Sequence, residues 1–558
     1  MTQSCRQCTG PFEITQGDLE FYDTISPTFS GIKFSVPPPT LCPECRFQMR
    51  LMMRNDRHLY HRKSSLSGRQ IISIYAPEKT FPVYDQTEWW SDAWDARTYG
   101  REIDESKPLC EQLQELRLVV PRISLFTVDC DNSYFTNHAL HMKNCYLVFG
   151  GANNEDCMFG NYVSFSKDTL DGLCLYTCER CYEGISSQHC YDCVHFTNCR
   201  NCTSCMFIED CESCSNCIGC FGLHRKENCM FNEQLTKEEF LKRRKELGNF
   251  TAGTLALLQK KFTVLKRDLP HRSSHTYGSE ECTGAAIYNS KNCTSCFDVT
   301  DCEDGKFLAF TPKGIHTHDA TFTSPGGLEW CYNIASTVGT TNAITTFLAW
   351  YGSNVYYSIE CHSCRDIFAC AGLRNARYCI LNKQYTKEEY EREVARLITH
   401  MLKTGEWGEF FPKKMCPYGY NETNAIDYLP LTRAEALSRG FQWRDELEKK
   451  EVYLGPKCAV SDDIAKIDES ICDAILVCEV TGKPFKIIPQ ELKFYRTMGL
   501  PLPRRCFEQR HKDRLARRNP RKLWERQCDK CKKSIQTNYS PNRSETVYCE
   551  NCYLADVY

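Results

Sequence analysis

The 558-residue sequence lacks the features that most simply assign a function. It has no apolar run approaching the ~18 residues of a membrane span, and no basic segment followed by an apolar one at its start. No Walker loop, GxGxxG, GxSxG or HExxH motif occurs in it. Its net charge is -2, which identifies no partner because a basic surface can be offset elsewhere. These absences predict no membrane association and favour a protein that is not an enzyme.

Cysteine, by contrast, is abundant, with 39 residues in the chain. A start without a secretion signal predicts a cytoplasmic protein, where thiols stay reduced and paired CxxC elements hold metal more often than they form disulfides. The odd total also argues against a complete disulfide framework. The composition therefore points to metal binding or to packing as the role of the thiols.

Between Ser133 and Cys229 the cysteines follow a period of twelve residues. A fixed short period predicts a solenoid, and twelve residues of about 3.3 Å each give a perimeter of roughly 40 Å, which admits only small side chains. The residue before each position in this phase is mostly Asn or Asp, which tolerate left-handed backbone angles and predict a turn in every coil. In repeat length and cysteine content the stretch resembles the narrow β-helix of beetle antifreeze proteins. The cysteines in phase, expected to be stacked in the core, are Cys145, Cys157, Cys181, Cys193, Cys205, Cys217 and Cys229.

A second stretch keeps this period with fewer cysteines. Small or aliphatic residues replace cysteine in the same phase, which favours packing over thiol chemistry. Both stretches end in a TKEE capping box, at Thr236 and Thr386, that predicts the start of a helix. The positions before Cys379 in this phase are Ile367, Val355, Ala343 and Cys331.

Two CxxC pairs lie near each end of the chain. Four thiolates can surround zinc tetrahedrally, and a site filled by four protein ligands is structural because it leaves no place for water or substrate. We predict two Zn²⁺ ions per chain. The expected ligands are Cys5, Cys8, Cys42 and Cys45 for one ion and Cys528, Cys531, Cys549 and Cys552 for the other.

The two ends are copies of each other, each a tandem of two ribbons. An offset of 464 residues aligns Cys42 with Cys506 and continues through the following helix and hairpin. Each copy has lost a different metal site, and we expect the depleted N-terminal ribbon to be held by packing alone. For that ribbon, a hard-cation site on the oxygen ligands of Ser64, Ser67, Asp85 and Glu88 is the alternative. The depleted positions are Ser64, Ser67, Asp85 and Glu88 in one copy and Cys478, Thr481, Cys506 and Gln509 in the other.

The predicted fold is thus mainly β with helices: two narrow β-solenoids of twelve-residue period, flanked by duplicated tandem zinc-ribbon modules. The expected segments are tandem ribbons over 1–92, a capping helix and strand over 93–132, the first solenoid over 133–235, a linker helix over 236–274, the second solenoid over 275–385, a helix and connector over 386–470, and tandem ribbons over 471–558. A ribbon of the form C-x2-C, FxI, FY, PP-x2-CPxCR, followed by an RL-x2-RN helix and cysteine-periodic coils, resembles an uncharacterised bacterial family of Cys-rich, zinc-ribbon-containing proteins. That family has no assigned activity, so the resemblance implies an architecture and no function.

Arginines recur at helical spacing after the second CxxC pair and at the matching place near the C-terminus. Arginine without lysine in both copies favours a side chain whose fork meets phosphate or carboxylate. We therefore predict a non-enzymatic scaffold that binds nucleic acid or a ribonucleoprotein, with pairing to acidic residues of the solenoid as the alternative. The stripes are Arg46, Arg50, Arg54 and Arg57, and Arg510, Arg514, Arg518 and Arg521.

Two further functions remain open from the sequence. In a structural protein that forms homo-oligomers, ribbons cap the solenoids and outward aromatic residues pack against other copies. In a thiol-rich metal-binding or redox protein the ladder itself is active, and the run Cys211, Cys214, Cys217 and Cys220 has the spacing of iron-sulfur ligands in part. The outward aromatics predicted for assembly are Tyr146, Phe159, Tyr182, Phe207 and Phe231.

Overall fold

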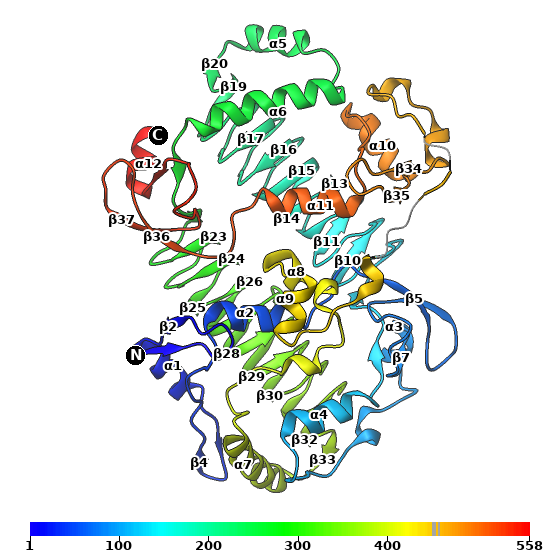
Figure 1. Ribbon diagram of the computed structural model, residues 1–558, viewed down its shortest axis with the longest axis vertical. Coiled ribbons are helices and arrows are strands. Elements are labelled where there is room, and N and C mark those ends of the chain that lie inside the picture. The colour runs from blue at the N-terminus through cyan, green and yellow to red at the C-terminus, as the bar shows by residue number, and fades with distance from the viewer. Residues whose placement is uncertain (449–452, 456–457, 558) are drawn as a thin grey trace. The chain divides into compact units, whose positions relative to one another are not determined.

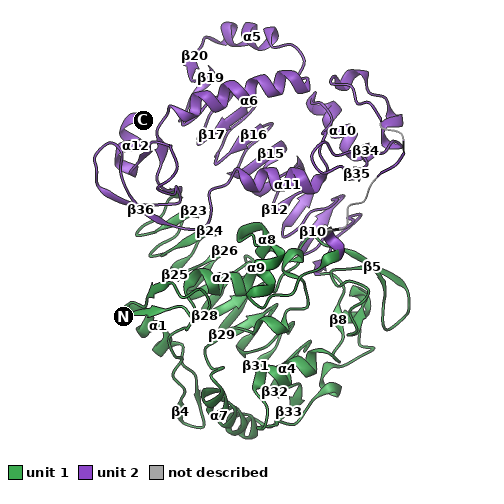
Figure 2. Ribbon diagram, viewed as in Figure 1, with its two compact units in different colours: residues 1–125, 276–445 green, residues 126–275, 446–558 purple. Residues whose placement is uncertain are grey.

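The computed structural model describes residues 1–448, 453–455 and 458–557 (Figure 1). The chain divides into two units, each made of two separate stretches (Figure 2). Unit 1 contains residues 1–125 and 276–445, and unit 2 contains residues 126–275 and 446–558. Each end of the chain therefore folds with the more distant of the two periodic stretches. The predicted connector includes residues 449–452 and 456–457, and the last predicted module ends at residue 558; these positions lie outside the described residues.

Unit 2 is built on a twelve-stranded sheet, the first sheet, in which every pairing except the last is parallel. Paired residues are twelve apart: Leu140 pairs with Ala152, and Cys217 pairs with Cys229. The predicted advance of one strand every twelve residues is confirmed. Its strands are β9 (Thr127–Val128), β10 (Ala139–Lys143), β11 (Ala152–Glu155), β12 (Asn161–Ser164), β13 (Lys167–Leu170), β14 (Leu173–Tyr176), β15 (Glu179–Gln188), β16 (Val194–Thr197), β17 (Met206–Glu209), β18 (Ser215–Ile218), β19 (Glu227–Met230) and β20 (Glu233–Gln234).

Unit 1 is built on a second twelve-stranded sheet, again parallel except for its last pairing. The twelve-residue register holds over most of it, as in the pairing of Val355 with Ile367. Between β27 and β28 the register is fourteen residues, with Gly314 opposite Leu328. The strands are β22 (Thr276–Tyr277), β23 (Gly284–Tyr288), β24 (Cys296–Thr300), β25 (Glu303–Lys306), β26 (Ala309–Pro312), β27 (Gly314–Thr321), β28 (Leu328–Ala335), β29 (Thr340–Phe347), β30 (Ser353–Tyr356), β31 (Arg365–Phe368), β32 (Arg377–Ile380) and β33 (Lys383–Gln384).

Left-handed residues form the corners of both sheets. The residues that precede the phase positions of the first sheet all have positive φ, between 43° at Asn132 and 54° at Asn228, as their Asn and Asp content predicted. The pattern is denser than expected, because left-handed residues recur every three positions, for example at Phe135, His138 and His141. Each such residue costs on the order of 1 kcal/mol or more. Hydrogen bonds between coils offset this cost.

One corner illustrates the compensation. The backbone N–H of Asn144, whose φ is 53°, donates to the carbonyl of Asp131 in the preceding coil at 3.1 Å. The N–H of Tyr146 donates in the other direction, to the carbonyl of Cys157 at 3.0 Å. Because every coil repeats this pattern, the backbone of a narrow coil is satisfied by its neighbours rather than by water.

Cysteine fills the interior of the first sheet. Cys181, Cys193, Cys205 and Cys217 follow one another in register and are at most 2% exposed. The Sγ atom of Cys181 lies 3.3 Å from the carbonyl oxygen of Glu179 and 3.5 Å from that of Cys190, and the other ladder thiols make the same contacts. The thiols therefore donate to backbone carbonyls inside the coil, as expected for core residues.

The two ends of the chain fold as copies. The hairpin β5–β6 and strand β7 recur 464 residues later as β36–β37 and β38 with identical bounds relative to that offset. The first copy, the N-terminal module, contains β1 (Thr2–Ser4), β2 (Pro11–Glu13), α1 (Gln16–Thr24), β3 (Thr28–Phe29), β4 (Ile32–Lys33), α2 (Pro43–Leu51), β5 (Tyr60–Lys63), β6 (Gln70–Ser73), β7 (Val83–Tyr84) and α3 (Gln86–Trp90). The second copy, the C-terminal module, contains β34 (Leu476–Val477), β35 (Pro484–Phe485), α10 (Pro489–Met498), α11 (Phe507–Ala516), β36 (Trp524–Gln527), β37 (Ser534–Thr537), β38 (Val547–Tyr548) and α12 (Glu550–Val557).

Each module lies against the sheet of its own unit. In unit 1, α2 contacts β27 and β28, and in unit 2, α11 contacts β14. The remaining elements of unit 1 are η1 (Ala96–Tyr99), α4 (Leu109–Arg117), β8 (Arg122–Ile123), α7 (Lys387–Thr404), η2 (Lys413–Met415), η3 (Tyr420–Glu422), α8 (Ala425–Tyr428) and α9 (Arg433–Ser438). Those of unit 2 are α5 (Lys237–Glu246), α6 (Ala252–Arg267), β21 (His271–Arg272), η5 (Ile464–Lys466) and η6 (Glu469–Cys472), while η4 spans Asp445–Glu448.

The predicted capping boxes are present. The Thr236 side chain accepts from the backbone N–H of Glu239 at the start of α5, and Thr386 does the same with Glu389 at the start of α7. Among the described residues, no helix combines the length and the apolar character needed to cross a membrane.

Candidate metal centres and arginine clusters

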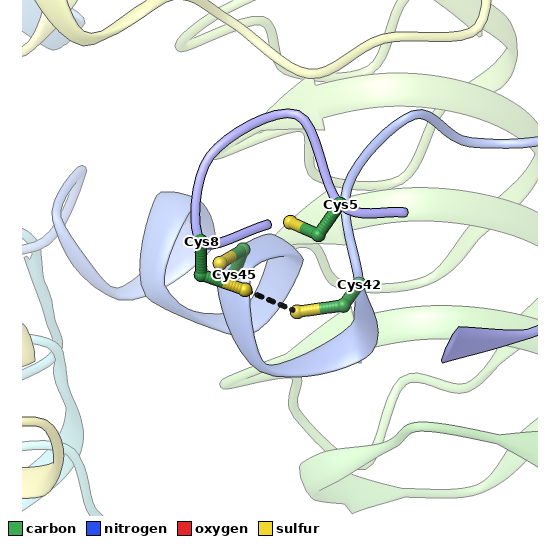
Figure 3. A group of neighbouring side chains, drawn as sticks. All are labelled: Cys5, Cys8, Cys42 and Cys45. Atoms are coloured by element: carbon green, nitrogen blue, oxygen red, sulfur yellow. Dashed lines mark hydrogen bonds between the residues drawn. The ribbon is translucent and has the colours of Figure 1, made fainter. Parts of the chain in front are cut away.

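The first four-cysteine group joins a hairpin turn to the start of a helix (Figure 3). Cys5 and Cys8 lie in the turn between β1 and β2, where the N–H of Cys5 donates to the carbonyl of Gly10 at 2.9 Å. Cys42 is the N-cap of α2, and Cys45 lies in its first turn. All four sulfur atoms lie within 4.8 Å of one another, and those of Cys8 and Cys42 are 3.7 Å apart.

The second group repeats this arrangement in the C-terminal module. Cys528 and Cys531 lie in the turn between β36 and β37, and Cys549 and Cys552 lie at the start of α12. The four sulfur atoms are again within 4.8 Å, with 3.7 Å between Cys531 and Cys549. Burial raises the pKa of the Cys528 thiol, but backbone N–H groups of Cys531, Cys549 and Lys530 outweigh this and lower the pKa to about 6.

The geometry of both groups fits a metal ion. A tetrahedral zinc ion with Zn–S bonds of about 2.3 Å places its sulfur ligands about 3.8 Å apart. The observed separations of 3.7 Å agree with that edge length. A hydrogen bond from Cys45 lowers the pKa of Cys42 to about 5, and the same hydrogen bond raises the pKa of Cys45. The two groups can therefore hold two metal ions, each in a closed site.

The depleted ribbons keep the same turn without a complete ligand set. The N–H of Ser64 donates to the carbonyl of Arg69 at 2.8 Å, as the N–H of Cys478 does to Lys483 at 2.9 Å. In the N-terminal module, Ser64 hydrogen-bonds the carboxylate of Glu88, to which Arg69 also donates at 3.2 Å. In this depleted ribbon a hydrogen bond thus joins Ser64 and Glu88, two of the four positions that are occupied by neighbouring cysteines in the intact ribbons.

In the C-terminal module, the depleted ribbon has weaker links between its ligand positions. The Oγ1 atom of Thr481 lies 3.9 Å from the sulfur of Cys506, and Gln509 donates instead to Asp513 at 2.8 Å. Among the residues described, only the two four-cysteine groups bring three or more His, Cys, Asp or Glu side chains to metal-binding distance.

The N-terminal arginine stripe is buried against the second sheet. Arg46 and Arg50 both bind Asp319, each with an N···O distance of 2.9 Å, and Arg50 is 0% exposed. Arg54 pairs with Asp56 at 2.6 Å, and Arg57 donates to both carboxylate oxygens of Asp427. One carboxylate of β27 therefore receives two guanidinium groups of α2.

The C-terminal stripe repeats the contact in unit 2. Arg510 and Arg514 each lie 2.9 Å from Asp171, and Arg514 also pairs with Glu183 at 2.7 Å. Arg518 donates to the sulfur of Cys174 at 3.1 Å, and Arg521 is half-buried.

The positions of four stripe arginines favour the alternative of pairing with acidic residues of the solenoid over binding to phosphate. Burial keeps these guanidinium groups from a phosphate in solution, and each is paired with a carboxylate. Arg46, Arg50, Arg510 and Arg514 therefore match the alternative of pairing within the chain. Sequence reasoning did not identify Asp171 or Asp319. The signal in the sequence that could have indicated a carboxylate partner was the absence of lysine from the stripes. Carboxylates, like phosphates, accept two parallel hydrogen bonds from arginine, which lysine cannot donate.

The aromatic residues of the assembly hypothesis have packing partners within unit 2. Tyr182 packs edge-on against Tyr495 at 5.6 Å, and Phe159 stacks on Phe507 at 5.9 Å. Phe207 is 2% exposed in the same apolar cluster, against which Tyr146 and Phe231 also pack. Residues of the same unit bury Phe159, Tyr182 and Phe207, whereas Tyr146 and Phe231 are half-buried. Packing of these rings against other copies stays a prediction.

The run from Cys211 to Cys220 belongs to the core of the first sheet. All four thiols are at most 1% exposed, and each approaches the backbone carbonyl two residues before it. They do not form one of the groups at metal-binding distance within the described residues.

Fold and site together define a protein with two large, mainly parallel sheets and two closed four-cysteine centres. Comparison with protein-family models, with curated proteins and with solved structures finds no match in any of the three.

Proposed function

We propose that this chain is a non-enzymatic, zinc-stabilised scaffold in which each end module is a tandem of ribbons that braces a narrow β-solenoid. The observation that carries the proposal is the buried pairing of Asp319 with Arg46 and Arg50, repeated by Asp171 with Arg510 and Arg514. A buried charge is tolerated only when it is paired and hydrogen-bonded. Each module and its sheet therefore depend on each other for stability.

Zinc is the metal that we assign to both centres. Four thiolates in a tetrahedron select zinc or an iron-sulfur site, and the 3.7 Å sulfur separations suit a single ion. Four protein ligands leave no open coordination position, so the ion would support the ribbon and the helix that supply its ligands, without a part in catalysis.

The twelve-residue coils suit a structural role as well. A buried column of thiols that donate to carbonyls 3.2–3.7 Å away is shielded from oxidants and from metals in solution. The redox and metal-storage alternatives would need reactive, accessible thiols, and no contact of the ladder favours them.

Elemental analysis of protein purified without oxygen tests the proposal. We expect two zinc ions per chain and no iron. Chelation should destabilise the two modules, whereas alkylation of ladder cysteines should require global unfolding. Iron with visible charge-transfer absorption, or four or more zinc ions per chain, would contradict the scaffold assignment.

A further inference from the structure

The helices that follow the two TKEE boxes have diverged in charge. The stretch 237–267, which forms α5 and α6, contains nine Lys or Arg and three Glu. The corresponding helix α7, over 387–404, contains four of each sign. Since the whole chain has a net charge of -2, the α5–α6 stretch is a local concentration of positive charge.

Four lysines of α5 and α6 are exposed and have no ion pair among the described residues, whereas Lys266 of α6 pairs with Glu209 at 2.8 Å. Lys237, Lys242, Lys245 and Lys260 are exposed, and none has an ion pair within the described part of the chain. In α7, by contrast, Lys387 lies 3.8 Å from Glu391, and Arg396 pairs with Glu105 at 2.7 Å. Neighbouring acids pair with Arg243, Lys266 and Arg267. The four lysines are part of the positive charge of α5–α6 that these pairs leave.

The apolar sides of α5 and α6 already face the core of unit 2. Phe240, Leu258 and Phe262 belong to its buried apolar cluster. Helical spacing places Lys242 about 160° from Phe240, and Lys260 on the side opposite Leu258 and Phe262. A helix that lies in a bilayer needs a continuous apolar face. The large apolar side chains that the described residues of α5 and α6 leave exposed are Leu241, Leu257 and Val264, and a few exposed apolar side chains of this kind are ordinary on a protein surface.

We propose that the outer face of α5–α6, through Lys237, Lys242, Lys245 and Lys260, binds the sugar-phosphate backbone of nucleic acid. Lysine is a flexible point charge that suits phosphates at irregular spacing, and backbone contacts of this kind carry no sequence preference. The proposal adds a partner to the scaffold function and rests on that function only for the fold that presents the helices.

Binding of fluorescent single-stranded and double-stranded oligonucleotides of mixed sequence tests the proposal. Each phosphate that a lysine neutralises adds about 0.7 to 0.9 to the slope of log affinity against log salt. Changing all four lysines to Gln should flatten the slope by about three units. In the wild type, a slope of about three from these four lysines means that affinity falls about 60-fold when the salt concentration rises from 50 to 200 mM.

The matched control is a variant with Lys387→Gln and Lys403→Gln in α7, which should leave affinity and slope unchanged. Both variants should keep two zinc ions and the wild-type melting temperature, so a failure of the scaffold assignment would appear in the metal content instead. No binding of either oligonucleotide at low salt, or an unchanged slope in the four-lysine variant, would overturn the proposal. So would binding to anionic vesicles in preference to both oligonucleotides.

Discussion

Units 1 and 2 contain the same docking contact in two electrostatic versions. In unit 1, Asp18 of α1 binds Lys306 at 2.7 Å beside the Arg46–Asp319 pair. In unit 2, Glu491 of α10 corresponds to Asp18, since Glu491 precedes Leu492 as Asp18 precedes Leu19. Glu491 pairs with Arg510 at 3.4 Å. Met158 of unit 2 occupies the place of Lys306 in unit 1. Lys306 pairs with His318, which precedes Asp319, and Met158 pairs with Leu170, which precedes Asp171.

The missing lysine changes the protonation of the buried acid. In unit 2, burial raises the pKa of Glu491 to about 7, against the pull of Arg510. In unit 1, burial also raises the pKa of Asp18, but the hydrogen bond from Lys306 contributes to a net lowering. The tyrosine contacts nearby are kept, with Tyr22 against Tyr332 at 5.2 Å and Tyr495 against Tyr182 at 5.6 Å. Packing and the Arg–Asp pair thus repeat in both copies, whereas the flanking charges differ.

The largest expected difference in stability is between a variant that loses a cysteine of an intact ribbon and one that loses a cysteine of a depleted ribbon. Cys528→Ser should unfold the C-terminal module, because structural zinc contributes roughly 10 kcal/mol or more to the stability of small ribbons. Cys478→Ser, in the depleted ribbon of the same module, should be far milder. Hydrogen exchange of β36–β37 and zinc content measure both effects, and equal effects would mean that the depleted ribbon still binds metal.

Removing the central carboxylate should destabilise either unit. Asp319→Asn leaves Arg46 and Arg50 buried without their anion, and breaking a buried pair typically costs about 3–5 kcal/mol. Denaturant unfolding followed by hydrogen exchange should locate the loss in unit 1 alone. Asp171→Asn should do the same in unit 2, and a loss below 1 kcal/mol in both would show that the arginines find other partners or water.

The pH dependence should distinguish the two units. The pKa of Glu491 is about 7 in the folded state against an ordinary 4.5, so the folded state binds the proton more tightly. Stability from this group is therefore greatest below pH 4.5 and falls as pH rises toward 7, by at most about 3 kcal/mol. Glu491→Gln should raise the stability of unit 2 at pH 8 and change little at pH 4.5.

Met158→Lys provides the matched test, since it introduces the cation that unit 1 has at this place. It should lower the pKa of Glu491 and flatten the same pH profile. Thermal melts between pH 4.5 and 8 measure both variants, and a profile that neither variant alters would assign the pH dependence to other groups.

The smallest effect concerns the ladder. Cys205→Val should be tolerated, because Val355 occupies the corresponding phase position of the second sheet. Cys205→Phe should cost about 1–3 kcal/mol or more, since a narrow, close-packed core suffers from overpacking. Cys205→Ser should lie closer to the valine variant in urea unfolding. If serine were the worst of the three, the thiol would have a chemical role.

The amino-acid sequence alone determined the period, the duplications and the two four-cysteine sets. These are local or repeated properties. Asn132 and Asn144 favour left-handed backbone angles by their own chemistry, and Cys528 and Cys531 are positioned by one tight turn. The three-residue spacing of the corners was missed because residues such as Phe135 and His141 occupy them, and these side chains give no left-handed signal of their own.

Only the tertiary structure decided what the arginines bind. Arg46 meets Asp319 across 273 residues, and Arg510 meets Asp171 across 339. Nothing in a helix indicates which distant coil will cover it, so a row of arginines is the same in sequence whether it faces solvent or a buried carboxylate. Burial separated these arginines from the lysines of α5–α6, because an ionic side chain removed from water must find its counter-charge within the fold.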